Sequence, residues 1–220
     1  MFHWLEKHPF FFAVFLFVTI AFAGLVEIIP GFAQASRPVV GLEPYTILQL
    51  AGKNIYLKEN CNACHSQLIR PFKSETDRYG HFSISGEFAY DRPFTWGSKR
   101  TGPDLARVGN YRTTDWHEGH IRDPQGVVEG SIMPPYPWLF KKTADIETAY
   151  AEALTVNLVF GTPYKPEQLP VNDLDEAKRI ALAEAQAIVD DIKDDGVKAA
   201  YNEGKIAEVV ALIAYLNSRK

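Results

Sequence analysis

The sequence predicts a mainly α-helical protein, in which a single N-terminal transmembrane helix precedes one globular domain. Three observations support this fold class. The chain has 220 residues, enough for one ordinary domain and an appendage. An apolar segment free of charge lies near the N-terminus, and helical spacing of apolar residues opens and closes the remainder. The middle of the chain, from 66 to 142, has little periodicity and predicts long ordered loops with short helices.

The N-terminal apolar segment is long enough to cross a membrane. From Phe10 to Val26 there is no charged residue, and at about 1.5 Å per residue this stretch spans roughly 26 Å as a helix, close to the hydrocarbon thickness of a bilayer. The alternative is a cleaved secretory signal, because 33–35 (Ala-Gln-Ala) has the small-x-small form of a cleavage site. The length of the apolar run and the acidic Glu6 ahead of it favour a retained anchor.

Charges beside this segment predict its orientation. Lys7 precedes the segment and Arg37 is the only nearby basic residue after it, so a weak positive-inside bias places the N-terminus in the cytoplasm. The bulk of the chain then lies outside. We expect an anchor over 1–35, a linker punctuated by Pro and Gly over 36–43, and a globular domain over 44–220.

Apolar stripes predict the helices of the globular domain. The first helix is expected within 45–60 and leads directly into the two cysteines, and the last is expected within 204–220. Two further helices are expected at about 143–160 and 174–193. The stripes consist of Leu48, Gly52, Ile55 and Tyr56 in the first helix and of Ile206, Val209, Val210, Ile213 and Leu216 in the last.

The charge balance excludes one class of function. The chain has 23 basic and 27 acidic residues and a net charge of -4, with no basic block. A nucleic-acid surface requires clustered positive charge, so this class of partner is not expected.

The stretch "ENCNACHSQ", residues 59–67, contains both cysteines of the chain. Two thiols at the spacing of Cys61 and Cys64 can form thioethers to both vinyl groups of one haem, and the adjacent His65 is then held under the iron as an axial ligand. The motif therefore predicts one covalently bound haem c.

Three other interpretations of the cysteine pair are a disulfide, a thioredoxin-like redox pair and half of a zinc site. A structural zinc site ordinarily has four protein ligands, and the other histidines are scattered. A redox pair is expected near a strand-helix-strand pattern, which the sequence lacks. Haem is favoured because the motif agrees with the compartment that the anchor implies.

The second axial ligand of such a haem has one soft candidate. Met133 is the only methionine apart from the initiator, and it lies in "GSIMPPYPW", where prolines stiffen the segment. A thioether ligand raises the reduction potential and suits an electron carrier, although a methionine alone is more often core filler. The rival ligands are His81, His117 and His120.

These motifs together resemble a class I cytochrome c domain. The Cys-x-x-Cys-His motif is followed by "TGPDL" (101–105) and then by a lone methionine in a Pro-rich loop. The resemblance implies that the Gly-Pro turn packs against His65 and that the carbonyl of Pro103 accepts the imidazole N–H. It also implies that the first and last helices cross at a small residue and an aromatic. The matching residues at this crossing are Gly52, Tyr56 and Tyr215.

A narrower resemblance rests on three longer stretches behind a single anchor: "CHSQLIRPF", "YDRPFTWGSKRTGPDLARVG" and "SIMPPYPWL". Over essentially the full length, the chain resembles the mono-haem cytochrome c subunit of cbb(3)-type haem-copper oxidases, the FixO/CcoO type. The resemblance implies that the subunit receives electrons from a periplasmic donor or a di-haem cytochrome c sister subunit and passes them to haem b of the catalytic haem b and copper subunit, where oxygen is reduced.

The same resemblance implies a single-pass protein in the lipid of the bacterial inner membrane, with its globular domain in the periplasm. The chain has no copper ligands, no second haem motif and one hydrophobic span. It is therefore expected to be no enzyme by itself, but the electron-transfer subunit of an oxygen-reducing, proton-translocating oxidase in aerobic respiration.

Two alternatives remain open at this level. One is the cytochrome c subunit of a nitric oxide reductase, whose partner uses non-haem iron in place of copper. The other is a free-standing anchored carrier, or a haem-based sensor if the methionine ligand is labile. The long segment 66–100 and the helices after Phe160 argue against a minimal shuttle. That segment mixes arginines and aromatics, which predicts either a subunit interface or a loop that covers the haem propionates.

Overall fold

A computed structural model describes residues 2–33, 37–97 and 99–220. It divides into two compact units, Met1–Arg37 and Pro38–Lys220. The described residues are mainly helical and contain no β-strand, only an isolated bridge between Thr143 and Ala207. This confirms the mainly α fold class. Gln34 and Ala35 of the candidate cleavage site lie outside the described residues.

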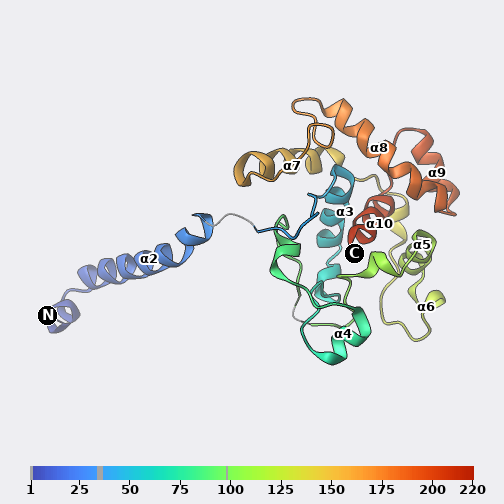
Figure 1. The fold of residues 1–220 in the computed structure, drawn as a ribbon. Helices are drawn as coiled ribbons and strands as arrows, with labels where there is room; N and C mark the ends of the chain where they lie inside the picture. The colour runs from blue at the N-terminus through green and yellow to red at the C-terminus, as the bar shows by residue number, and fades with distance from the viewer. Residues whose placement is uncertain (1, 34–36, 98) are drawn as a thin grey trace. The chain divides into compact units, whose positions relative to one another are not determined.

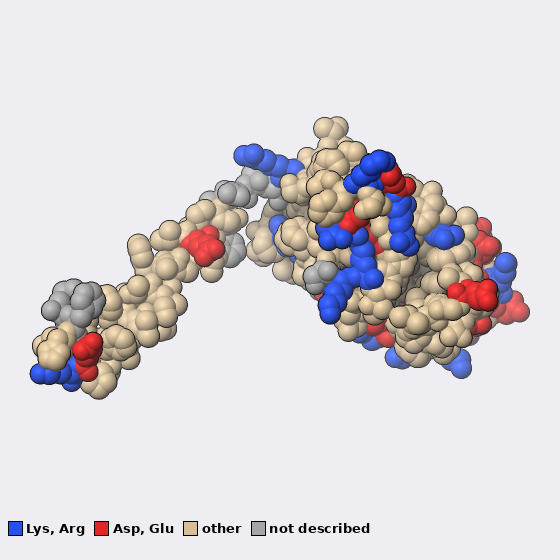
Figure 2. Space-filling view, turned by 90° about the horizontal axis from the view of Figure 1, so that it is seen from below, with Lys and Arg blue, Asp and Glu red and all other residues tan. Residues whose placement is uncertain are grey.

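The N-terminal unit consists of α1 (Phe2–Lys7) and α2 (Pro9–Ala33). Figure 2 shows that the surface of the long helix is almost free of charged side chains. Among the described residues, Pro9–Gly31 is the one stretch that is long and apolar enough to cross a membrane. The predicted N-terminal apolar helix is thus confirmed by length and composition.

The second unit is built from helices of unequal length (Figure 1). The longer ones are α3 (Ile47–Lys58), α7 (Ile146–Phe160), α8 (Leu174–Asp191) and α10 (Glu208–Ser218). The shorter ones are α4 (Lys73–Tyr79), α5 (Thr114–Arg122), α6 (Pro124–Val127) and α9 (Asp195–Asn202), with the 3-10 turns η1 (Cys61–Ala63), η2 (Ser85–Phe88), η3 (Val108–Asn110) and η4 (Pro137–Phe140).

The four long helices expected from the sequence are present as α3, α7, α8 and α10. Polar residues ahead of the first turn define where several of them begin. Thr46 forms a capping box with Gln49 at the start of α3. Asp145, Asp173 and Asp194 accept backbone hydrogen bonds at the starts of α7, α8 and α9. Helix α9 was not predicted from the sequence.

The core is organised by the crossing of α3 and α10, which lie side by side in Figure 1. A Cβ atom at Gly52 would lie 1.9 Å from the carbonyl oxygen of Ala211, so the two backbones meet where no side chain fits. The rings of Tyr56 and Tyr215 pack with their centroids 5.5 Å apart. The expected crossing at a small residue and an aromatic is confirmed.

A buried ion pair ties the loop region to this helix pair. Lys53 Nζ of α3 donates to Asp91 Oδ1 at 2.7 Å, and both side chains are 1% exposed. The guanidinium of Arg219, just after α10, lies 3.7 Å from the other carboxylate oxygen of Asp91. Burial lowers the pKa of Lys53, and the attraction of Asp91 opposes this shift. The pair fixes where the loop around Asp91 meets the core.

Candidate functional site

The cysteine motif forms a tight turn directly after α3. Asn60 adopts a left-handed conformation with φ of 60°, and the 3-10 turn η1 follows. The backbone N–H of His65 donates to the carbonyl of Cys61 at 2.9 Å, which closes the turn. Cys61 and Cys64 form no disulfide bond. The motif is therefore a compact loop with two thiols and an imidazole in one turn.

The environment of Cys61 differs from that of a reactive redox cysteine. Burial raises the pKa of Cys61 to about 12, and the nearby Glu59 raises it further. Thioredoxin-like thiols instead have a lowered pKa, because the thiolate is the nucleophile in disulfide exchange. The half-buried Cys61 thus holds its proton at pH 7, which argues against the redox-pair interpretation.

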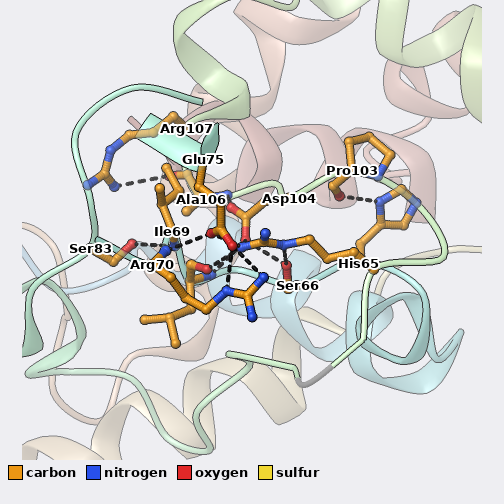
Figure 3. A network of polar contacts seen from close by, with 12 residues as sticks. His65, Ser66, Ile69, Arg70, Glu75, Ser83, Pro103, Asp104, Ala106 and Arg107 are labelled. Atoms are coloured by element: carbon orange, nitrogen blue, oxygen red, sulfur yellow. Dashed lines mark hydrogen bonds and ion pairs between the residues drawn. The ribbon is translucent and has the colours of Figure 1, made fainter. Parts of the chain in front are cut away.

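The ring of His65 is held by a carbonyl from a distant part of the chain. Its Nδ1 lies 2.8 Å from the oxygen of Pro103, as Figure 3 shows. A carbonyl oxygen only accepts, so Nδ1 carries the hydrogen and Nε2 keeps its lone pair. Partial burial lowers the pKa of His65, which favours this neutral form. The tautomer is the one that can bind a metal through Nε2.

Gly102 allows the Gly-Pro turn to approach this ring. A Cβ atom at Gly102 would lie 2.3 Å from Cε1 of His65, too close for any side chain. The Gly102 N–H donates to the carbonyl of Cys64 at 2.8 Å. The hydroxyl of Tyr56 donates to the carbonyl of His65 at 3.0 Å. The histidine is thus fixed by its neighbours on both sides.

Met133 lies half-buried in the segment that precedes η4. Trp138 Nε1 of η4 donates to the Glu59 carboxylate at 3.1 Å, just ahead of the motif. Burial raises the pKa of Tyr136, and the nearby thiols of Cys61 and Cys64 raise it further. The hydrogen bond of Trp138 thus joins the segment that follows Met133 to Glu59, just ahead of the cysteine motif.

The three rival histidines occupy different environments. His81 is exposed and stacks on Phe82. His117 of α5 is 3% exposed, and burial lowers its pKa to about 4. His120 stacks on Trp116 with centroids 4.5 Å apart. Burial lowers the pKa of His120, and the proximity of His65 lowers it further. All three histidines therefore stay rivals to Met133, and His120 is the one whose pKa is affected by His65.

A polar network that was not predicted surrounds the segment after His65 (Figure 3). Its centre is Asp104, whose side chain is fully buried. Arg100 reaches the same carboxylate and also Glu75. The hydrogen bond from Arg100, aided by those from Arg70, lowers the pKa of Glu75 to about 2. The only sequence signal was position, because Ser66 follows His65 and Asp104 follows Pro103.

The segment 66–100 is partly packed on itself and partly exposed. Its arginines Arg70 and Arg100 are engaged by Glu75, so they are not free for a partner. Its aromatic side chains are more accessible: Phe94 is 50% exposed and stacks on Trp96, which is 37% exposed. The structure therefore divides the segment into a self-paired polar part and an exposed aromatic part.

The donor set fits a single haem c. It offers two thiols at the required spacing, a neutral imidazole with a free Nε2, and a thioether in an adjoining segment. Within the described ranges, no group of three or more His, Cys, Asp and Glu side chains could hold a metal ion. A structural zinc site needs such a group.

A helical unit whose Cys-x-x-Cys-His turn is closed against a Gly-Pro loop has the arrangement of a c-type cytochrome. Comparison with family models narrows this class. The model described as "Cytochrome C oxidase, mono-heme subunit/FixO" matches residues 2–219. The chain belongs to this FixO family, which comprises mono-haem subunits of cytochrome c oxidase, and a haem is therefore implied. No curated protein matches the sequence.

Proposed function

We propose that this chain is a membrane-anchored mono-haem cytochrome c that relays electrons within a cbb(3)-type terminal oxidase. Electrons arrive from a periplasmic cytochrome c or a di-haem cytochrome c subunit and leave to haem b of the catalytic haem b and copper subunit. The observation that carries the proposal is the family match over residues 2–219. The chain itself is not the oxygen-reducing enzyme.

The residues of the cysteine turn have distinct roles in this proposal. Cys61 and Cys64 would hold haem c through thioethers, and His65 would bind the iron through Nε2. Met133 would supply the other protein ligand of the iron. The haem, when bound, supplies a one-electron iron couple. The Pro103 carbonyl, 2.8 Å from Nδ1 of His65, fixes the ring and increases the basicity of the ligand.

The anchor and its surroundings follow from the same proposal. Helix α2 is inserted in the lipid of the bacterial inner membrane, the N-terminus is cytoplasmic, and the cytochrome unit lies in the periplasm. We assign the anchor to 1–35, the linker to 36–43 and the cytochrome domain to 44–220. The apolar length of Pro9–Gly31 supports the membrane insertion.

The proposal is tested by identifying what copurifies with the chain. The subunit is tagged in a host that makes its natural partners, extracted in mild detergent, and analysed by reduced-minus-oxidised spectra and metal content. We expect haems b and c together with copper. The matched control is a double variant, Cys61→Ala with Cys64→Ala, which is expected to lack haem c in this chain.

Two other outcomes would replace the proposal. Haems b and c with non-haem iron and no copper would assign the chain to a nitric oxide reductase. Haem c alone, under conditions that keep membrane complexes intact, would leave a free-standing anchored carrier.

A further inference from the structure

The segments 64–66 and 102–105 meet beside His65 and are joined by backbone hydrogen bonds as well as by the histidine ring. The backbone N–H of Gly102 donates to Cys64 at 2.8 Å, and that of Leu105 donates to Ser66 at 2.8 Å. The ring of His65 reaches the carbonyl of Pro103 between these two bonds. Residues 64–66 and 102–105 are therefore paired along their length, with the histidine contact in the middle.

Asp104 fastens this pairing from its buried side. Its Oδ2 accepts from the hydroxyl of Ser66 at 2.6 Å and from the N–H of Leu68 at 2.9 Å, while its Oδ1 accepts from the N–H of Ala106 at 2.8 Å. Ser66 is 2% exposed and Asp104 is 1% exposed. Because water does not compete at buried sites, charge-assisted bonds of this kind hold a fixed geometry.

Arg100 completes the arrangement and neutralises the buried carboxylate. Its Nε donates to the Ser66 hydroxyl at 2.6 Å, and its terminal nitrogen donates to the Leu68 carbonyl at 2.7 Å. The same nitrogen lies 3.3 Å from Asp104 and 2.7 Å from Glu75. The Ser66 hydroxyl thus accepts from Arg100 and donates to Asp104, so one side chain joins both charges.

We propose that Ser66, Asp104 and Arg100 form a positioning clamp that sets the length of the hydrogen bond between His65 and Pro103, and through it the reduction potential of the haem. The inference rests on the proposed function, since it assigns the clamp to the iron ligand. The clamp holds the residue after His65 to the residue after Pro103. Loosening it lengthens the histidine bond and reduces the basicity of the ligand, which favours ferrous iron.

The test uses the full-length, haem-loaded chain in detergent, with variants Ser66→Ala and Asp104→Asn. Ser66→Ala leaves the backbone bonds to Asp104 intact, so the chain is expected to fold. Ser83→Ala is the matched control. The Ser83 hydroxyl accepts a hydrogen bond from the N–H of Ile69 at 3.0 Å, close to Ser66 in the sequence, but Ser83 is not part of the clamp.

Three quantities are measured. They are the amount of haem attached per chain, the ratio of reduced to oxidised haem at a fixed potential, and the rate at which the Nδ1 proton of His65 exchanges with solvent, followed by NMR in the reduced protein. Both clamp variants are expected to keep the haem and to exchange this proton at least fivefold faster. The equilibrium is expected to shift at least threefold toward the reduced form, about 28 mV at 59 mV per tenfold for one electron. Ser83→Ala is expected to change the proton exchange rate and the reduction equilibrium by no more than twofold each.

The outcomes separate this inference from the proposed function. If the wild-type chain attaches no haem, the proposed function fails and the clamp inference fails with it. If haem is attached but both clamp variants keep the wild-type exchange rate and potential, the clamp inference alone is overturned. Equal shifts in Ser83→Ala would also overturn it, because they would show a general response of the segment.

Discussion

The helix crossing at Gly52 and the paired loops around His65 both bring two backbone segments into close contact. Different interactions stabilise the two contacts. At the crossing, the backbones of α3 and α10 meet at Gly52 without a side chain between them, and apolar packing around this point stabilises the contact. At the loops, the chain has little regular structure, and a buried polar network stabilises it. Apolar packing tolerates small changes of geometry, whereas a hydrogen-bonded network depends on every partner. The region with the chemistry is thus the one with the stricter geometry.

The largest effect is expected from the crossing. Gly52→Ala places a methyl group 1.9 Å from the Ala211 carbonyl, so the helices must separate. We expect a loss of roughly 3 kcal/mol or more in the free energy of unfolding, measured by denaturant titration. Gly119→Ala in α5 is the control, because its new methyl group would meet only a Val127 side chain at 3.3 Å. Equal stability of the two variants would show that the crossing is not the organising contact.

The next effect concerns the proposed iron ligand at the edge of the loop region. Met133→Leu is expected to retain haem at the cysteines but to lower the reduction potential by on the order of 0.1 V, since a thioether ligand favours ferrous iron. Redox titration of the purified chain measures the change. The neighbouring Ile132→Leu is the control, as Ile132 is 78% exposed. An unchanged potential in Met133→Leu would reject Met133 as ligand and direct attention to His120.

Acid should weaken the polar network around Glu75 but not the apolar packing at the helix crossing. The pKa of Glu75 falls from an ordinary 4.5 to about 2, so its stabilising contribution is complete above about pH 4.5 and is lost as the pH falls toward 2. In Glu75→Gln, the free energy of unfolding should be lower at pH 7 and should depend less on pH over this range. Glu203→Gln, in an exposed ion pair with Lys205, is the control. A pH dependence unchanged from wild type would show that Glu75 does not contribute this stability.

The smallest effect is expected from the exposed aromatic part of 66–100, where a substitution should change assembly but not the fold of the chain. Trp96→Ala should keep haem and fold but weaken assembly with the catalytic subunit by about 1–2 kcal/mol, as expected of an aromatic anchor at an interface. Copurification in detergent measures it, with Tyr111→Ala, an exposed aromatic outside the segment, as control. A complex that stays intact would favour the alternative, a loop that covers the haem propionates.

The sequence predicted the region organised by apolar packing better than the region organised by polar contacts. The stripes through Leu48 and Val209 repeat within one helix, so local spacing was sufficient to locate α3 and α10. Helix α9 was missed because its sequence, "DGVKAAYN", is short, polar and contains Gly196. Propensity alone does not locate so short a helix.

The network could not be predicted in the same way, because the partners that join its two segments are far apart in the sequence. Ser66 and Asp104 are separated by 38 positions, and neither residue type indicates burial. The buried pair of Lys53 and Asp91 has the same separation. The cysteine turn and His65 were identified from local spacing, whereas their roles toward haem stay predictions.

The burial of the Arg100 and Glu75 pair reduces its sensitivity to salt around the protein. Their side chains are 19% and 7% exposed, so dissolved ions approach this pair poorly. The Lys73 and Asp77 pair nearby is 87% and 61% exposed and is screened at ordinary ionic strength. A change in the salt concentration around the protein therefore affects the exposed pair more than the buried pair. The geometry around His65 is insulated from those changes, whereas the surface of α4 is not.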